Sequence, residues 1–128
     1  MANSNFADFV RELFAPWATV VVRPMFGGAG VYRDGLMFAL LADDRIFLKT
    51  SDNTKPNFEA AGSTPFIFQP KSGPAMTMSY YLMPDAAYDD PDALNQWANL
   101  GWQAALAGKV KKAAKKVKIQ HRQRPHRY

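Results

Sequence analysis

The chain has 128 residues, none of them cysteine and only two of them histidine. Without cysteine, the protein forms no disulfide and offers neither a thiol nucleophile nor thiolate ligands to a metal. His121 and His126 both lie in a basic C-terminal segment, so no ordered histidine base is expected for acid–base or nucleophilic catalysis. We therefore predict no catalytic residues and no enzymatic activity.

Long apolar runs are also missing. The longest, Leu36 to Ala42, is far shorter than the roughly 20 residues that a membrane-spanning helix needs. The N-terminal segment MANSNFADFV has neither the basic region nor the apolar region of a secretory signal. These absences predict a cytoplasmic protein without a membrane partner.

Acidic residues are absent from the last 20 positions. Residues 109–128 hold nine of the 16 Lys and Arg and none of the 11 Asp and Glu, so residues 1–108 carry a formal charge of 7 − 11 = −4. A fold does not require such a segregation of charge, which therefore indicates a partner or a solubilising role. We divide the chain into a domain at 1–108 and a basic, flexible tail at 109–128.

The domain begins with an amphipathic helix that ends before Pro16. Its apolar residues recur at helical spacing: Phe6, Phe9, Val10, Leu13 and Phe14. A β-branched strand at 19–26 follows, and the turn pairs Asp34-Gly35 and Asp43-Asp44 then predict two hairpins and a meander of three or four strands.

The second half predicts a short helix at 51–62, strands at 66–69 and 76–83, and a long final helix. Asp89 or Asp90 should cap that helix with Pro91 at its first position, and Gly108 should either end or loosen it. We expect one tyrosine of the pair Tyr80-Tyr81 in the core and the other half exposed. The order helix, meander, helix, two strands, helix predicts an α+β, two-layer sandwich with an antiparallel sheet.

The glycine-rich stretch RPMFGGAG matches neither common nucleotide-binding motif. No Lys-Ser or Lys-Thr follows it, and it leads into a strand rather than a helix. We interpret it as a sharp turn or bulge between strands, with an anion-binding nest as the alternative. The residues concerned are Arg23, Met25, Phe26, Gly27, Gly28 and Gly30.

Carboxylates cluster in two places, at Asp43-Asp44 and at Asp89, Asp90 and Asp92. Turn chemistry explains the first cluster and helix capping explains the second. We therefore predict no metal site and no cofactor.

The basic tail is the strongest lead to a ligand. If helical, it surrounds a stripe of valine and alanine with lysines, and such a segment neutralises phosphates with little sequence preference. The alternatives are a solubilising tail without a partner and a membrane-surface helix, which the small apolar area disfavours. The candidate nucleic-acid-binding residues are Lys109, Lys111, Lys112, Lys115, Lys116, Lys118, Arg122, Arg124 and Arg127.

Several blocks in fixed order resemble the TfoX N-terminal domain family. They are Met25-Phe26-Gly27-Gly28, Asp34-Gly35 with Met37-Phe38-Ala39, Ala42-Asp43-Asp44-Arg45 leading to Leu48-Lys49, and Met78-Ser79-Tyr80-Tyr81. The resemblance runs from the first helix to about Leu106 and implies an α+β fold like that of secretion chaperones. It departs from the family at Pro24, where a basic residue often follows the arginine.

The family takes its name from two-domain regulators of natural competence, whereas this chain resembles a stand-alone domain with a basic tail. The resemblance brings no catalytic residues. We therefore expect a non-enzymatic domain that acts through an unknown protein partner, as a regulatory module linked to competence or transcription, and that forms a homodimer through an exposed strand edge. The alternative is a nucleic-acid-associated protein that binds through its tail.

Overall fold

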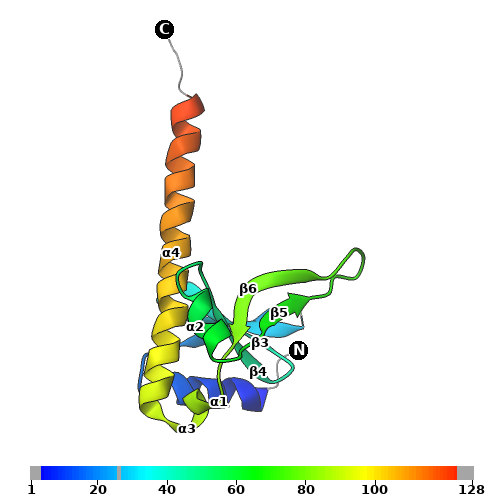
Figure 1. Cartoon of the computed structure of the whole chain (residues 1–128), viewed down its shortest axis with the longest axis vertical. Coiled ribbons are helices and arrows are strands. Elements are labelled where there is room, and N and C mark those ends of the chain that lie inside the picture. The colour runs from blue at the N-terminus through cyan, green and yellow to red at the C-terminus, as the bar shows by residue number, and fades with distance from the viewer. Residues whose placement is uncertain (1–3, 26, 124–128) are drawn as a thin grey trace.

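A computed structural model describes the backbone of residues 4–25 and 27–123 and the side chains of residues 5–25 and 27–114. It contains four helices and six strands (Figure 1). The elements are α1 (Ser4–Phe14), β1 (Val21–Met25), β2 (Gly28–Arg33), β3 (Leu36–Ala42), β4 (Arg45–Lys49), α2 (Lys55–Ala60), β5 (Pro65–Phe68), β6 (Met76–Leu82), α3 (Ala86–Asp89) and α4 (Pro91–Gln123).

The strands form a single antiparallel sheet in the order β1-β2-β3-β4-β6-β5. The first four strands are the predicted meander, and β6 rather than β5 pairs with β4. β5 is therefore an edge strand although it precedes β6 in the chain. The predicted α+β class and the order of its elements are confirmed, with α3 as an additional short helix.

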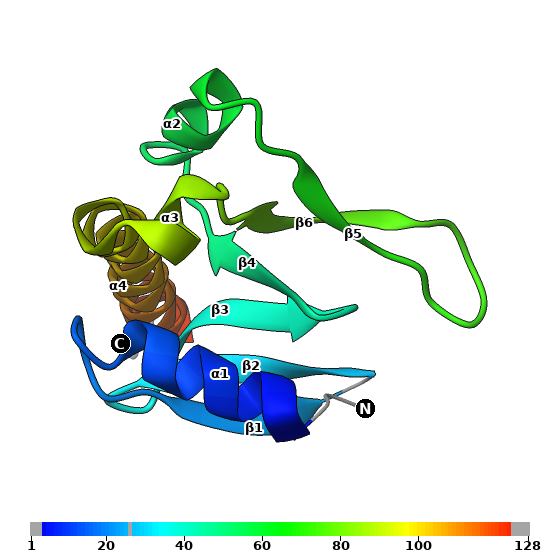
Figure 2. The same cartoon turned by 90° about the horizontal axis from the view of Figure 1, so that it is seen from below.

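One face of the sheet packs against the helices, as Figure 2 shows for α1, α3 and α4. The main core lies between these two layers and includes residues of every helix and of the central strands. Among its fully buried side chains are Val10 and Phe14 of α1, Phe38 of β3 and Phe58 of α2. The Phe14 and Phe38 rings pack edge to face in this core, with their centroids 5.5 Å apart.

Both predicted turn pairs form two-residue hairpin loops. Arg33 pairs with Leu36 around the first, and Ala42 pairs with Arg45 around the second. The backbone φ angles in these loops are all positive: Asp34 51°, Gly35 78°, Asp43 51° and Asp44 56°. Positive φ at both loop residues is the geometry of a type I′ turn, whose twist matches that of the strands.

The final helix starts as predicted and ends much later. Asp90 caps it by accepting a hydrogen bond from the Asp92 backbone N–H at 3.0 Å, and Pro91 is its first residue. α4 passes through Gly108 without interruption and continues to Gln123, so its 33 residues span about 50 Å. Figure 1 shows its C-terminal half rising past the sheet. Thus, the predicted division at residue 108 does not coincide with a break in secondary structure, and residues 109–123 are helical.

Candidate binding face of the sheet

A β-bulge decides which side chains of β3 lie away from the helices. Val31 pairs with Ala39 and Tyr32 with Met37, which leaves Phe38 without a partner in β2. Because of the extra residue, Phe38 and Ala39 both join the main core, and Leu40 joins a second cluster. That cluster consists of Leu40, Phe47 and Tyr80 with the partly buried Met37, Ala42, Phe66, Met78 and Leu82. We call the side of the sheet that carries it the open face.

The glycine-rich stretch forms the hairpin between β1 and β2. Met25 pairs with Gly28, and Gly27 has a φ of +74°. A Cβ atom at Gly28 would lie 2.1 Å from the carbonyl oxygen of Leu41, so only glycine lets β2 approach β3 at this point. Phe26, part of the predicted motif, lies outside the described residues.

Gly30 makes room for two methionines. A Cβ atom there would lie 3.0 Å from the Sδ of Met37 and 3.1 Å from the Sδ of Met25. Arg23 lies beside them, with its guanidinium 5.3 Å from the centre of the Tyr32 ring. The motif residues therefore bring methionine side chains together rather than presenting an array of charged groups.

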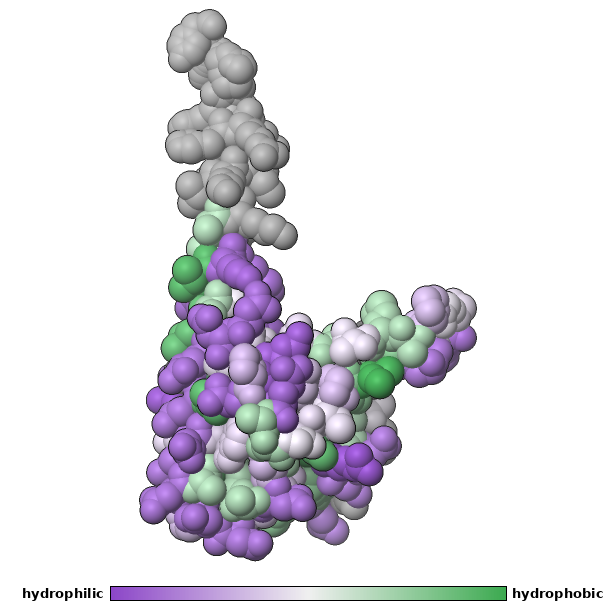
Figure 3. All heavy atoms as spheres, in the orientation of Figure 1, coloured by the Kyte–Doolittle hydropathy of each residue, from purple (hydrophilic) through white to green (hydrophobic). Residues whose placement is uncertain are grey.

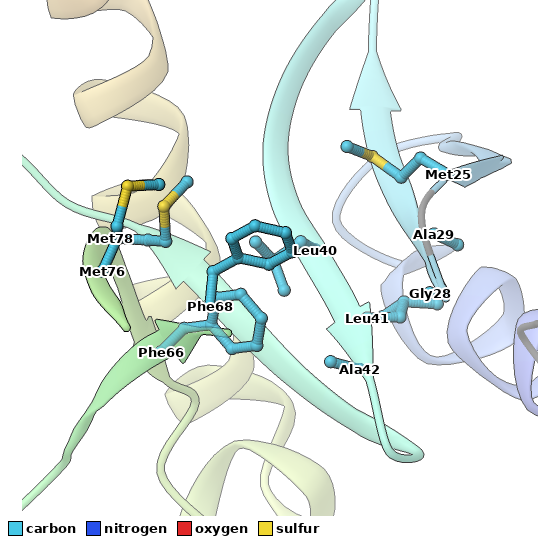
Figure 4. A pocket seen from close by; sticks show the side chains of 10 residues that line it. All are labelled: Met25, Gly28, Ala29, Leu40, Leu41, Ala42, Phe66, Phe68, Met76 and Met78. Atoms are coloured by element: carbon cyan, nitrogen blue, oxygen red, sulfur yellow. The ribbon is translucent and has the colours of Figure 1, made fainter. Parts of the chain in front are cut away.

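Between this hairpin and the β5–β6 hairpin lies an apolar hollow of about 340 Å³. Figure 4 shows Phe66, Phe68, Met76, Met78 and Leu40 on one side of it and Met25 with residues of β2 and β3 on the other. Every side chain that lines it is apolar: Met25, Ala29, Leu40, Leu41, Ala42, Phe66, Phe68, Met76 and Met78, with Gly28 contributing backbone. We call this cavity the methionine hollow.

The β5–β6 hairpin extends one wall of the hollow beyond the body of the protein (Figure 1). Its apolar residues Ile67 and Met76 are 58% and 49% exposed, and Met25 on the opposite wall is 40% exposed. Figure 3 shows apolar residues along this projecting hairpin, whereas most of the visible body is hydrophilic. Exposed apolar side chains concentrated in one place mark contact surfaces in proteins.

The side chains that line the hollow are suited to binding apolar groups rather than to catalysis. No side chain that lines it is acidic, basic or a nucleophile of the serine, cysteine or lysine type, so the hollow supplies no acid and no base. Methionine side chains are flexible and polarisable, and they adapt to apolar partners of different shape. The arrangement is therefore that of a binding surface for apolar side chains.

The tyrosine pair differs from the prediction. Tyr80 and Tyr81 are both buried, at 8% and 6% exposure: Tyr81 belongs to the main core, and Tyr80 is packed among the apolar side chains of the open-face cluster. Tyr81 donates a hydrogen bond to the Glu59 carboxylate at 3.1 Å. On the open face, burial raises the pKa of Tyr80 to about 12, so this phenol stays protonated at neutral pH. The expectation of one half-exposed ring is wrong.

The tail residues lie on one continuous helix. The side chains of Lys109, Lys111 and Lys112 are exposed on α4 and form no ion pair within the described part of the chain. The backbones of Lys115, Lys116, Lys118 and Arg122 continue the same helix, whereas Arg124 and Arg127 lie outside the described residues. A role for these residues in binding nucleic acid stays a prediction.

The walls of the hollow were not predicted as a site. The signal for them is the repetition of large apolar residues at every second position, Phe66 and Phe68 in one strand and Met76 and Met78 in the next. Such alternation indicates which residues share a face of a strand. It does not say whether a helix covers that face.

The acidic clusters lie where turns and caps require them, as described above for Asp44 and Asp90. Among the described side chains, those of residues 5–25 and 27–114, no group of three or more His, Asp or Glu is placed to hold a metal ion. In the same part of the chain, no helix combines the length and the apolar character needed to cross a membrane.

One comparison with known proteins gives a match. The family model of the TfoX N-terminal domain matches residues 12–105, which include the glycine-rich hairpin and both walls of the hollow. No curated protein matches the chain.

Proposed function

The chain belongs to the TfoX N-terminal domain family, and we propose that it is a non-enzymatic binding module that holds an apolar segment of a partner polypeptide on its open sheet face. The observation that carries this proposal is the methionine hollow, whose walls consist only of apolar side chains and stay open to solvent. Relatives that give the family its name regulate natural competence. We therefore expect the partner to be a protein that acts in transcription and the module to be regulatory.

Burial of apolar area supplies the affinity in this proposal. Each side chain on the rim that loses its exposed area to a partner contributes roughly 25 cal/mol per Å². Met25 and Met76 line the hollow and have exposed apolar area that a partner could bury. A partner that inserts one or two large apolar residues between the walls would cover both.

Photo-crosslinking in cells tests the proposal. A photoreactive residue replaces Met76 on the rim of the hollow, and the matched control replaces Ala60, which is exposed on α2. We expect discrete polypeptide adducts from position 76 and none from position 60. A further Met25→Glu substitution should remove the adducts, because it puts a charge on the opposite wall.

The identity of the adduct separates the kinds of partner. A second copy of this chain as the adduct would make the hollow a homodimer interface. No adduct from position 76, or equal adducts from both positions, would contradict a binding role for the open face.

A second candidate function is nucleic-acid binding through the basic part of α4. It is favoured by nine Lys and Arg within 20 residues that contain no acidic residue. Truncation after Gly108 should then abolish binding to DNA or RNA, and the logarithm of the full-length affinity should fall steeply with the logarithm of salt concentration. Circular dichroism checks that the truncated chain is folded. Equal binding by both chains would reject this function.

A further inference from the structure

A groove lies between the basic part of α4 and the adjacent end of the sheet, away from the methionine hollow. It has a volume of about 360 Å³. Three lysines line it, Lys49 at the end of β4 and Lys109 and Lys112 on α4. The remaining lining residues are Leu36, Met37, Tyr80, Ala105 and Gly108.

Contacts within the folded domain hold the side chain of Lys49 in place. Its side chain is half buried, and its Cε would lie only 3.4 Å from a Cβ atom at Gly108. Its ammonium lies 5.1 Å from the centre of the Tyr80 ring, within the range of a cation–π contact. The glycine and the tyrosine therefore hold the Lys49 ammonium beside the middle of α4.

This cation has no acidic partner. Lys49, Lys109 and Lys112 form no ion pair among the described residues. Burial lowers the pKa of Lys49 below its ordinary value, and the nearby ammonium of Lys112 lowers it further. Both effects arise because no negative charge balances the lysine ammonium groups, and an anion bound in the groove would balance them.

The surrounding groups leave the groove positive. Lys109 and Lys112 are three residues apart and thus share one side of the helix. The residues that line a neighbouring hollow include Lys49, Lys111 and Asp52. The Tyr80 phenol stays neutral below about pH 12. Asp52 is an acidic residue that lines the same neighbouring hollow as Lys49, so its charge can compete for that lysine.

We infer that this groove binds a backbone phosphate of nucleic acid, with Lys49 as a fixed contact and Lys109 and Lys112 as its partners from α4. The inference rests on the second candidate function and adds a residue of the folded domain to it. Single phosphates are small enough for the groove, and the lysines beyond it on α4 would contact the phosphates that follow. Lys49 then sets where the polyanion meets the domain.

The test compares full-length variants by fluorescence anisotropy with a labelled 20-base-pair DNA duplex over a range of salt concentrations. Lys49→Gln removes the fixed contact, and the matched control Lys71→Gln removes an exposed lysine from the β5–β6 loop. We expect Lys49→Gln to weaken binding roughly threefold to tenfold and to reduce the salt slope by about 0.9, the value for one lost phosphate contact. Lys71→Gln should change neither quantity.

Asp52→Asn provides a gain of affinity that no loss of folding can imitate. It removes the competing carboxylate, so the duplex should bind more tightly with an unchanged salt slope. Inorganic pyrophosphate, titrated separately, distinguishes a free phosphate ligand from nucleic acid.

Each outcome is decisive. If Lys49→Gln and Lys71→Gln bind the duplex with equal affinity, whether at the wild-type level or below it, the groove is not a phosphate site. Nucleic-acid binding by the tail is unaffected by that result. Pyrophosphate binding that depends on Lys49, with duplex binding that does not, overturns nucleic acid as the ligand. A full-length chain that binds no duplex overturns both the groove and the second candidate function.

Discussion

At the scale of single residues, glycines determine how closely the strands approach and where the methionines lie. Gly28 admits the Leu41 carbonyl, and Gly30 admits the sulfur atoms of Met25 and Met37. The same short stretch thus makes a tight hairpin and one wall of the methionine hollow. Its glycines serve packing and conformation together.

Gly28→Ala should destabilise the protein by at least about 2 kcal/mol, because the new methyl group meets a backbone oxygen that cannot move alone. Gly27→Ala is the control, since its Cβ would enter open space and meets only the cost of a positive φ, about 1 kcal/mol. Urea denaturation measures both. A Gly28→Ala variant no less stable than Gly27→Ala would contradict the close approach of β2 and β3.

The raised pKa of Tyr80 predicts a dependence of stability on pH. A folded pKa of about 12 lies above the ordinary 10, so the folded state keeps a proton that the unfolded state has lost. This contribution is complete below pH 10 and disappears as the pH rises through 12. Relative to Tyr80→Phe, the wild type should lose about 2 kcal/mol of unfolding free energy between pH 9 and pH 12. If the free energy of unfolding depends on pH in the same way for the wild type and for Tyr80→Phe, the phenol of Tyr80 is not buried as described.

At the scale of elements, the turns were predictable because their chemistry is local. The pairs Asp34-Gly35 and Asp43-Asp44 occupy type I′ loops, as expected for residues that tolerate positive φ. The cap of α4 at Asp90 follows from its own neighbours in the same way. Such features depend on four or five consecutive residues and on nothing more distant.

The second of these turns is not optimal. Asp44 has a φ of +56° where glycine has no steric penalty. Asp44→Gly should therefore stabilise the protein by about 1 kcal/mol, and Asp44→Ala should destabilise it by a similar amount. Thermal and urea denaturation measure the two variants. If Asp44→Gly is the less stable of the pair, the loop does not have type I′ geometry.

Elements that depend on distant residues escaped prediction. The bulge at Phe38 follows from the contact of Phe38 with α1 and α4 residues, and no local pattern announces it. The insertion of β6 between β4 and β5 likewise reflects which strand edges meet in space. The continuation of α4 has a simpler reason: one glycine costs a helix about 1 kcal/mol, and the lysines and alanines around Gly108 are good helix formers.

At the scale of the whole molecule, the helices cover one face of the sheet and leave the methionine hollow on the other. The alternation of large apolar residues in β5 and β6 indicates which of them share a face, although no site was predicted from it. It could not predict that this face is open, because an apolar strand face has the same pattern under a helix as in solution. The position of Lys49 against Gly108 was equally hidden, since the two residues are far apart in sequence.

The central claim is that the open face is an accessible, preformed apolar surface. Methyl NMR of protein labelled at the methionine methyl groups, titrated with the neutral apolar dye N-phenyl-1-naphthylamine, tests it most directly. The methyl signals of Met25, Met76 and Met78 should shift in a saturable way, while that of Met83, fully buried in the main core, should not. Signals from the hollow that stay unchanged, or a shift confined to Met83, would contradict the claim.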